Sequence, residues 1–304
     1  MSFGKIIFGD NQFLGINHAS QQKAAVMQDQ FRNIDEIVKV LGYAYEAGVR
    51  DFMFTTHDHF GGAFEEIARA RMFPDMQYIP CIPYAHKYAN ALAENGIFTV
   101  VMSRLRAMSK RRVLSGVGKA ALGDLGGMMQ LLVEVELLMT KGLNVRGVFL
   151  QNVIFDLMMG MGGQGIIEKF HKYVGRIGLT PGYITMNHPM AQRMLCDEIG
   201  LEKPWICSNF NVAGFRMNPS QETVEQSYGN GKSRNIAMSI FASGMLSPQE
   251  SVDYALARGG VDAVLFGSSK QANIVSNVER LLGRAGAAPA RPAPQRESES
   301  VAQS

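Results

Sequence analysis

The chain has few cysteines, no long apolar run and little net charge, and each of these features argues against a class of protein. Its 304 residues include three cysteines, widely spaced and without a CxxC pair, so no disulfide framework or cysteine-rich zinc module is indicated. No uncharged apolar run reaches about 18 residues and the N-terminus lacks a signal-peptide core, so neither a membrane span nor secretion is expected. A net charge of +3 gives no argument for nucleic acid as a partner. We therefore expect a cytoplasmic protein with reduced thiols that binds a small molecule.

Short apolar runs separated by helical patterns make up most of the chain. Hydrophobic residues are 46% of the total, which is enough for a full core. The expected strands are 5–9, 49–54, 77–82, 145–150, 182–186, 205–207, 236–241 and 261–266. The expected helices are 31–47, 65–72, 124–140, 166–176, 190–199, one from Ser220, 248–257 and 271–282. This alternation predicts a single (β/α)8 TIM barrel over 1–284, with a doubly wound open sheet as the alternative.

One interval between expected strands is much longer than the others. It covers about 87–122, between the third and fourth strands, and contains a basic cluster at 104–112. Insertions of this length are usually functional covers or oligomer contacts, so we expect a helical lid and a homo-oligomer contact through 97–140. The apolar run 97–102 is a competing strand that would change the count. Residues 285–304 are rich in Ala, Pro, Arg, Glu and Ser, which predicts a disordered tail.

Polar and titratable residues follow the expected strands directly. The densest group ends the stretch Phe52–His59, where a buried strand runs into two threonines and then His57, Asp58 and His59. Most of the histidines follow a strand in this way, namely His18, His57, His59, His86 and His188. Because a (β/α)8 barrel builds its active site at the carboxyl ends of its strands, this distribution predicts a site there. For any single histidine, capping a strand or bonding a loop carbonyl is an equal alternative.

The histidines suit acid–base chemistry or metal binding. The residues to which we assign catalytic roles are His57, Asp58, His59, His86 and His188. Asp58 either orients an imidazole or caps the next helix. His57 and His59, with His86 or His188 as a third ligand, have the character of a zinc-type site. Carboxylates are scarce at these strand ends, which argues against a hard-metal oxygen cage, so a divalent metal stays an open alternative.

A second group of polar residues has the character of ligand-binding groups. Amides and carboxylates at strand ends orient polar molecules in apolar pockets, although turns and caps explain them equally well. Small residues before the last helices leave backbone N–H groups for an anion such as phosphate, with tight turns as the alternative. The expected binding residues are Asp10, Asn11, His18, Gln151, Asn152, Asn187, Asn209, Ser243, Gly267, Ser268 and Ser269.

The last third of the chain carries a family resemblance. The segment Leu265–Asn277, LFGSSKQANIVSN, looks like the final strand and cofactor-binding helix of the aldo/keto reductase barrels. Ala47-Gly48-Val49 and Phe60-Gly61 resemble two further motifs of that family. The resemblance implies a (β/α)8 barrel, with a nicotinamide cofactor along Ser243, Gly267–Ser269 and Asn277.

The catalytic tetrad of that family, an Asp, a Tyr, a Lys and a His, is not retained at the matching positions. Phe60 stands where the resemblance places the proton-donating tyrosine, and Gln151 stands where it places the histidine. Asn273 replaces the basic residue that would bind the 2′-phosphate of NADP. A conventional NADPH-dependent carbonyl reductase is therefore disfavoured, because a shared fold does not fix the chemistry.

Three functional hypotheses remain open. The preferred one is an enzyme that acts on a small polar or anionic metabolite by histidine acid–base chemistry, of the lyase, isomerase or hydrolase type, with or without a metal. The second is an NAD(P)-dependent oxidoreductase with a non-standard catalytic set. The third is a non-catalytic barrel that binds a ligand or a partner protein.

Overall fold

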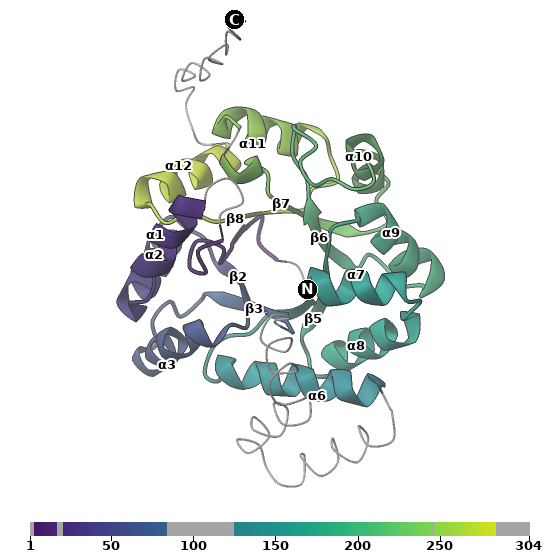
Figure 1. The fold of residues 1–304 in the computed structure, drawn as a ribbon, viewed down its shortest axis with the longest axis horizontal. Coiled ribbons are helices and arrows are strands. Elements are labelled where there is room, and N and C mark those ends of the chain that lie inside the picture. The colour runs from purple at the N-terminus through teal and green to yellow at the C-terminus, as the bar shows by residue number, and fades with distance from the viewer. Residues whose placement is uncertain (1–2, 17–20, 84–124, 245, 284–304) are drawn as a thin grey trace, which may run out of the picture.

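Eight parallel strands close into a barrel at the centre of the protein (Figure 1). The structure is a computed structural model that describes residues 3–16, 21–83, 125–244 and 246–283. The strands are β1 Ile6–Phe8, β2 Asp51–Thr55, β3 Gln77–Ile82, β4 Gly147–Leu150, β5 Thr180–Thr185, β6 Trp205–Asn209, β7 Arg234–Met238 and β8 Ala263–Phe266. Each strand pairs with its neighbours in sequence, and β8 pairs with β1 to close the ring. The predicted (β/α)8 barrel is confirmed, and the doubly wound sheet is wrong.

Helices surround the barrel as an outer ring (Figure 1). The α-helices are α1 Gln21–Gln30, α2 Ile34–Glu46, α3 Gly61–Ala70, α6 Leu125–Leu137, α7 Asn152–Gly160, α8 Gln164–Arg176, α9 His188–Gln192, α10 Gln221–Gly229, α11 Pro248–Ala257 and α12 Gln271–Leu281. Short 3-10 turns are η1 Asp58–Phe60, η2 Leu138–Thr140 and η4 Ala242–Gly244, and η3 Arg193–Glu198 is π-helical.

Apolar side chains fill the barrel interior. Inward positions on successive strands, among them Ile7, Met53 and Cys207, form one buried cluster with Phe149. The Phe149 ring takes space from the next strand, since a Cβ on Gly182 would lie 2.3 Å from it, and only glycine fits there. The interior is thus a packed core, so the ends of the strands are where a ligand can bind.

The outward faces of β1 and β2 pack on the helices through a cluster of phenylalanines. Phe52, Phe54, Phe60 and Phe64 are each no more than 1% exposed, and their rings stack or meet edge to face. Burying one such side chain contributes roughly 1.5–3 kcal/mol to the free energy of unfolding. Phe60 closes the short turn that carries His57, so this cluster fixes the segment that follows β2.

Local sequence signals set several helix starts. Asn33 caps α2 by accepting a hydrogen bond from the Asp35 backbone N–H at 3.0 Å. Ser220 caps α10 in the same way, with 3.2 Å between its Oγ and the Thr223 nitrogen, as the sequence predicts. Ser247 also precedes its helix as predicted, although its side chain makes no capping hydrogen bond.

Parts of the layout differ from the prediction. The helices α1 and α7 were not expected, because neither has the apolar period of an amphipathic helix. The strand expected at 236–241 is displaced, and β7 ends at Met238. The strand ends there because Ser239 and Ala242 have φ angles of 58° and 43°, and a β-strand requires negative φ angles.

Some expectations fall on residues that the structure does not describe. These are the insertion 87–122 with its run 97–102, and the tail 285–304. The oligomer contact through 97–140 lies partly in the same region and stays a prediction. Within the described ranges, no helix combines the length and apolar character that a membrane span requires.

Candidate active site

A buried carboxylate joins the carboxyl ends of β1 and β2. β1 ends at Phe8, whereas β2 continues to Thr55. The Thr55 backbone N–H donates to Asp10 Oδ2 at 2.6 Å, so a side chain takes the place of the next rung of the ladder. Asp10 is only 9% exposed. This predicted binding residue is therefore a buried carboxyl at the end of the barrel that the sequence predicts to be functional.

The environment of Asp10 favours its protonated form. Burial raises the pKa of Asp10 to about 6, because the charged form loses its hydration, and hydrogen bonds from Thr55 offset only part of that rise. The Cys81 thiol on β3 lies near it, and its own pKa is raised well above the usual value, first by burial and then by the Asp10 charge. A carboxyl with a pKa close to neutrality can serve as a general acid or base.

Gln12, which follows Asp10 in the turn after β1, has a buried acceptor with no partner among the described residues. Its Nε2 donates to the Gly9 carbonyl oxygen at 2.7 Å, which fixes the orientation of the amide. Its Oε1 is buried and accepts no hydrogen bond from the described residues, and the residue is 3% exposed. A Cβ on Gly267 would lie 2.2 Å from this oxygen, so the glycine after β8 makes room for the amide. The acceptor thus lies between the ends of β1 and β8.

Two more buried polar atoms follow β2. Thr56 Oγ1 and His59 Nε2 have no hydrogen-bond partner among the described residues. Leaving such an atom unpaired costs on the order of 1–3 kcal/mol, so native proteins keep few of them. We name Asp10, Gln12, Thr56 and His59 the rim cluster, since all four follow the ends of the neighbouring strands β1 and β2.

The histidine pair after β2 is organised by the backbone. His57 Nδ1 accepts a hydrogen bond from the His59 backbone N–H at 3.0 Å and caps η1. The two rings are 6.1 Å apart between centroids and nearly perpendicular, at 79°. Asp58 is exposed and is the first residue of η1, so the capping role falls to His57 and not to Asp58. The catalytic roles of His57, Asp58 and His59 stay predictions.

Amide side chains at other strand ends mainly support the backbone. Asn187 caps α9, with its Oδ1 3.1 Å from the Met190 nitrogen. Asn209 donates through Nδ2 to the Arg216 carbonyl at 3.2 Å and so shapes the loop after β6. These contacts fit the capping and turn alternatives that the sequence left open.

The remaining predicted binding residues occupy the rim without such a defined role. Gln151 precedes α7 as its N-cap residue, and Asn152 is the first residue of that helix, both half-buried. Asn11 is exposed in the turn after β1. His18 and His86 lie outside the described residues.

The ends of β7 and β8 lead into small-residue turns. Ser243 lies in η4. After β8, Gly267 is exposed and Ser268–Ser269 is half-buried. Lys270 is the N-cap residue of α12, is exposed and makes no side-chain capping bond. The N–H groups of the first turn therefore have no cap from this side chain, and Lys270 adds positive charge, which together suit an anion.

His188 does not belong to this site. Its Nδ1 lies 2.7 Å from Ser227 Oγ in α10, and its Nε2 lies 2.9 Å from Asn235 Oδ1 in β7. The residue is 1% exposed, and burial lowers its pKa to about 4, so the ring is neutral at physiological pH. Both ring nitrogens thus have partners in α10 and β7, which fits the structural alternative for a single histidine, and the catalytic or metal-binding role of His188 stays a prediction.

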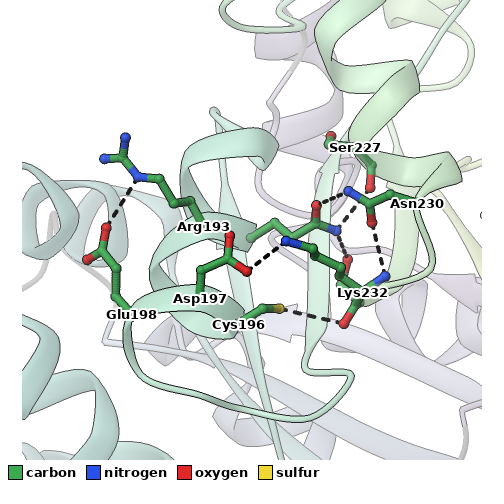
Figure 2. A network of polar contacts seen from close by, with 9 residues as sticks. Arg193, Cys196, Asp197, Glu198, Ser227, Asn230 and Lys232 are labelled. Atoms are coloured by element: carbon green, nitrogen blue, oxygen red, sulfur yellow. Dashed lines mark hydrogen bonds and ion pairs between the residues drawn. The ribbon is translucent and has the colours of Figure 1, made fainter.

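The same layer extends to the surface as a polar network (Figure 2). Gln192 Nε2 donates to the Ser227 carbonyl at 2.9 Å and to Ser233 Oγ at 2.7 Å. Lys232 pairs with Asp197 at 2.7 Å, as Figure 2 shows. These contacts join η3 to the loop between α10 and β7, which is a structural role.

The metal alternative gains no support from the described residues. No group of three or more His, Cys, Asp or Glu side chains there could hold a metal ion. His188 is bonded elsewhere, and His86, the other proposed third ligand, is not described. His57 and His59 therefore have no third ligand among the residues that the structure places.

Comparisons with known proteins identify the fold. No protein-family model matches the sequence, and the search of characterised proteins finds no match. A protein described as an aldo-keto reductase from Pseudomonas aeruginosa has 12% identity and a TM-score of 0.57, over 93% of this chain and 91% of that one. The glycerol dehydrogenase of Gluconobacter oxydans has 11% identity and a TM-score of 0.54, over 92% and 87%. Apo Gox0644 has 13% identity and a TM-score of 0.52, over 93% and 87%, and a variant of it was solved with NADPH. At such identities the likeness shows the aldo-keto reductase fold.

The sequence did not single out Gln12 and Thr56. Both are uncharged, and nothing in a single sequence separates an unpaired buried amide or hydroxyl from a paired one. The available signal was position, since Gln12 follows Asp10-Asn11 after β1 and Thr56 directly follows the last residue of β2.

Proposed function

We propose that this chain is a nicotinamide-dependent oxidoreductase whose active site lies at the carboxyl ends of β8, β1 and β2. The observation that carries the proposal is the buried Oε1 of Gln12, which has no hydrogen-bond partner among the described residues and lies beside Gly267, at a turn that opens into α12. The fold adds support, because its solved relatives are described as a reductase and a dehydrogenase. We prefer this function to the histidine-based lyase, isomerase or hydrolase that the sequence favoured.

The residues after β8 suit a dinucleotide. The first-turn N–H groups of α12, with Lys270, provide donors and positive charge for a pyrophosphate. Gln12 Oε1 can accept a hydrogen bond from an amide or hydroxyl group of the ligand. When bound, the dihydronicotinamide supplies a hydride, and the protein positions the acceptor carbon and excludes water.

The proposal favours NAD over NADP. Asn273 is exposed on the first turn of α12, at the position where the resemblance places a basic residue for the 2′-phosphate. A neutral amide gives no charge-assisted hydrogen bond to a phosphate dianion. We therefore expect tighter binding of NADH than of NADPH.

Fluorescence titration with NADH and NADPH tests the proposal. We expect saturable NADH binding by the wild-type chain and at least about tenfold weaker binding by Gly267→Ala, whose methyl group would displace Gln12. Gly165→Ala is the matched control, because that helical glycine has open space around its Cβ position. Absence of NADH and NADPH binding at high micromolar concentration would remove the proposed function.

The histidine hypothesis keeps one specific observation in its favour. His59 Nε2 is buried and has no partner among the described residues, as a proton-transfer group would be before its substrate binds. This second function predicts turnover of a polar metabolite without added nicotinamide. Equal turnover by His59→Gln and by the wild-type protein would exclude it.

A further inference from the structure

We propose that Asp10 is the proton donor of this active site and supplies the acidic hydrogen that Phe60 cannot. The inference rests on the proposed function and adds to it the group that completes the reduction.

The Asp10 carboxyl is fixed by the barrel itself. Its Oδ2 accepts the Thr55 backbone N–H at 2.6 Å, which orients the carboxyl between the ends of β1 and β2. The groups known to face it are neutral at physiological pH, namely Thr55 from β2 and the protonated Cys81 thiol from β3. Because neither carries a charge, burial dominates and the pKa of Asp10 rises to about 6.

Three other groups near the same strand ends, Phe60, Cys81 and His57, are less suitable proton donors. Phe60 has no hydroxyl and is fully buried among aromatic rings. The Cys81 thiol has its pKa raised by burial, so it releases a proton far less readily than Asp10. His57 uses Nδ1 as an acceptor for the His59 backbone N–H, which commits one of its ring nitrogens to structure.

The proposed step balances as a carbonyl reduction. A bound dihydronicotinamide would supply a hydride, with its two electrons, to the carbonyl carbon of the substrate and would itself be oxidised. Asp10 transfers its proton to the carbonyl oxygen, so that the product is an alcohol and Asp10 is left as a carboxylate. A proton from solvent then restores the acid. In the reverse direction the Asp10 carboxylate accepts the hydroxyl proton.

Asp156 offers a matched control within the same protein. Asp156 is a half-buried carboxyl whose pKa, like that of Asp10, is raised by burial, and it too accepts a backbone N–H at the end of a strand. Its Oδ1 lies 2.6 Å from Thr185 Oγ1, and its Oδ2 accepts the Met186 backbone N–H at 3.0 Å. A variant at each position therefore removes one carboxyl that supports a strand end, and of the two only Asp10 belongs to the rim cluster.

The test compares wild type, Asp10→Asn and Asp156→Asn in NADH-dependent reduction of 4-nitrobenzaldehyde, in NADH affinity and in infrared titration of the carboxyl band. We expect Asp10→Asn to lose at least about 100-fold in kcat with NADH affinity unchanged, and Asp156→Asn to stay within a few-fold of wild type. The wild-type rate should fall as pH rises through about 6. In the infrared spectrum, a protonated carboxyl band that titrates there should be missing from Asp10→Asn.

Three results would overturn the inference. They are full activity in Asp10→Asn, equal losses in Asp10→Asn and Asp156→Asn, and an Asp10 band that titrates near the ordinary value for aspartate. The infrared arm needs no cofactor. If the wild-type chain binds neither NADH nor NADPH, the proposed function fails and the step loses its hydride source, and the affinity arm alone identifies that failure.

Discussion

The rim cluster and the layer around His188 are both buried and polar, but their hydrogen bonding differs. Around His188 both ring nitrogens are bonded, and Asn235 adds donor bonds from its Nδ2 to the carbonyls of Tyr228 and Gly260. In the rim cluster, three atoms have no partner among the described residues, and they belong to Gln12, Thr56 and His59. The paired groups around His188 stabilise the fold, whereas the unpaired atoms of the rim cluster can still form hydrogen bonds with a ligand.

The difference supports placing the proposed site at the rim cluster. A paired buried network rigidifies a structure, and an unpaired buried group costs free energy that a ligand can recover on binding. Unpaired atoms also occur near the opposite end of the strands, for example Asp51 Oδ1 and Tyr78 Oη, so the count alone does not identify the site. The rim cluster differs because its unpaired atoms occur together with the buried Asp10 carboxyl and with the turn that leads into α12.

The largest effect should come from breaking the paired region. His188→Ala removes one hydrogen-bond partner each from Asn235 and Ser227 and opens a cavity, so the free energy of unfolding should fall by about 3–5 kcal/mol. His59→Ala should change it by no more than about 1 kcal/mol, because the lost Nε2 has no hydrogen bond to lose. Urea unfolding of both variants measures the contrast, and equal losses would contradict it.

The next effect is the pH dependence of stability at Asp10. Its pKa is about 6 in the folded protein and 3.8 in the unfolded reference, so the folded state binds more protons between these values. The contribution of Asp10 is therefore fully present below pH 4 and is lost as pH rises through 6. The difference corresponds to about 3 kcal/mol. Because asparagine does not titrate, Asp10→Asn should not lose this contribution. Its free energy of unfolding in urea, relative to that of wild type, should therefore rise by up to that amount between pH 4 and pH 7.

His188 should show the opposite slope. Its pKa is 6.5 in the unfolded reference and about 4 in the folded protein, so the unfolded state binds more protons in that interval. Its neutral form contributes stability above pH 6.5 that is lost as pH falls towards 4, again by about 3 kcal/mol. The wild-type chain should lose this contribution in acid, whereas His188→Ala should not. A pH-independent difference between these two proteins would show that His188 titrates normally.

A smaller effect should reveal the contact between Gln12 and Gly267. Gly267→Ala should lower the free energy of unfolding by about 1–2 kcal/mol, because a new methyl group would meet a buried amide that is anchored to Gly9. Adding Gln12→Ala should restore most of that loss. A double-mutant cycle measures the coupling, and additive losses would show that the two residues do not meet.

The smallest effect should be on cofactor choice. Asn273→Arg adds a cation on the exposed first turn of α12 and should improve NADPH binding by about tenfold, which corresponds to about 1.4 kcal/mol. NADH binding should stay within about twofold. Fluorescence titration of both cofactors gives the ratio, and an unchanged ratio would place the adenosine end of the cofactor elsewhere.

The sequence predicts the barrel well because strand burial and helix periodicity are local patterns. It places Asp10 correctly at a strand end, since strand order alone determines which residues meet there. It does not show how His188 is bonded, because position after a strand does not say whether the ring turns towards the barrel mouth or towards α10 and β7. It also cannot show that Gln12 Oε1 has no partner among the described residues, since the surroundings of this oxygen depend on the end of β8, more than 250 residues later.

A crystal structure of the full chain with NADH tests the central claim most directly. We predict cofactor density at the carboxyl ends of β8 and β1, within hydrogen-bonding distance of Gln12 Oε1 and of the first-turn N–H groups of α12. Occupancy of the Gln12 acceptor by another side chain of the protein, with no density there at saturating NADH, would contradict the account.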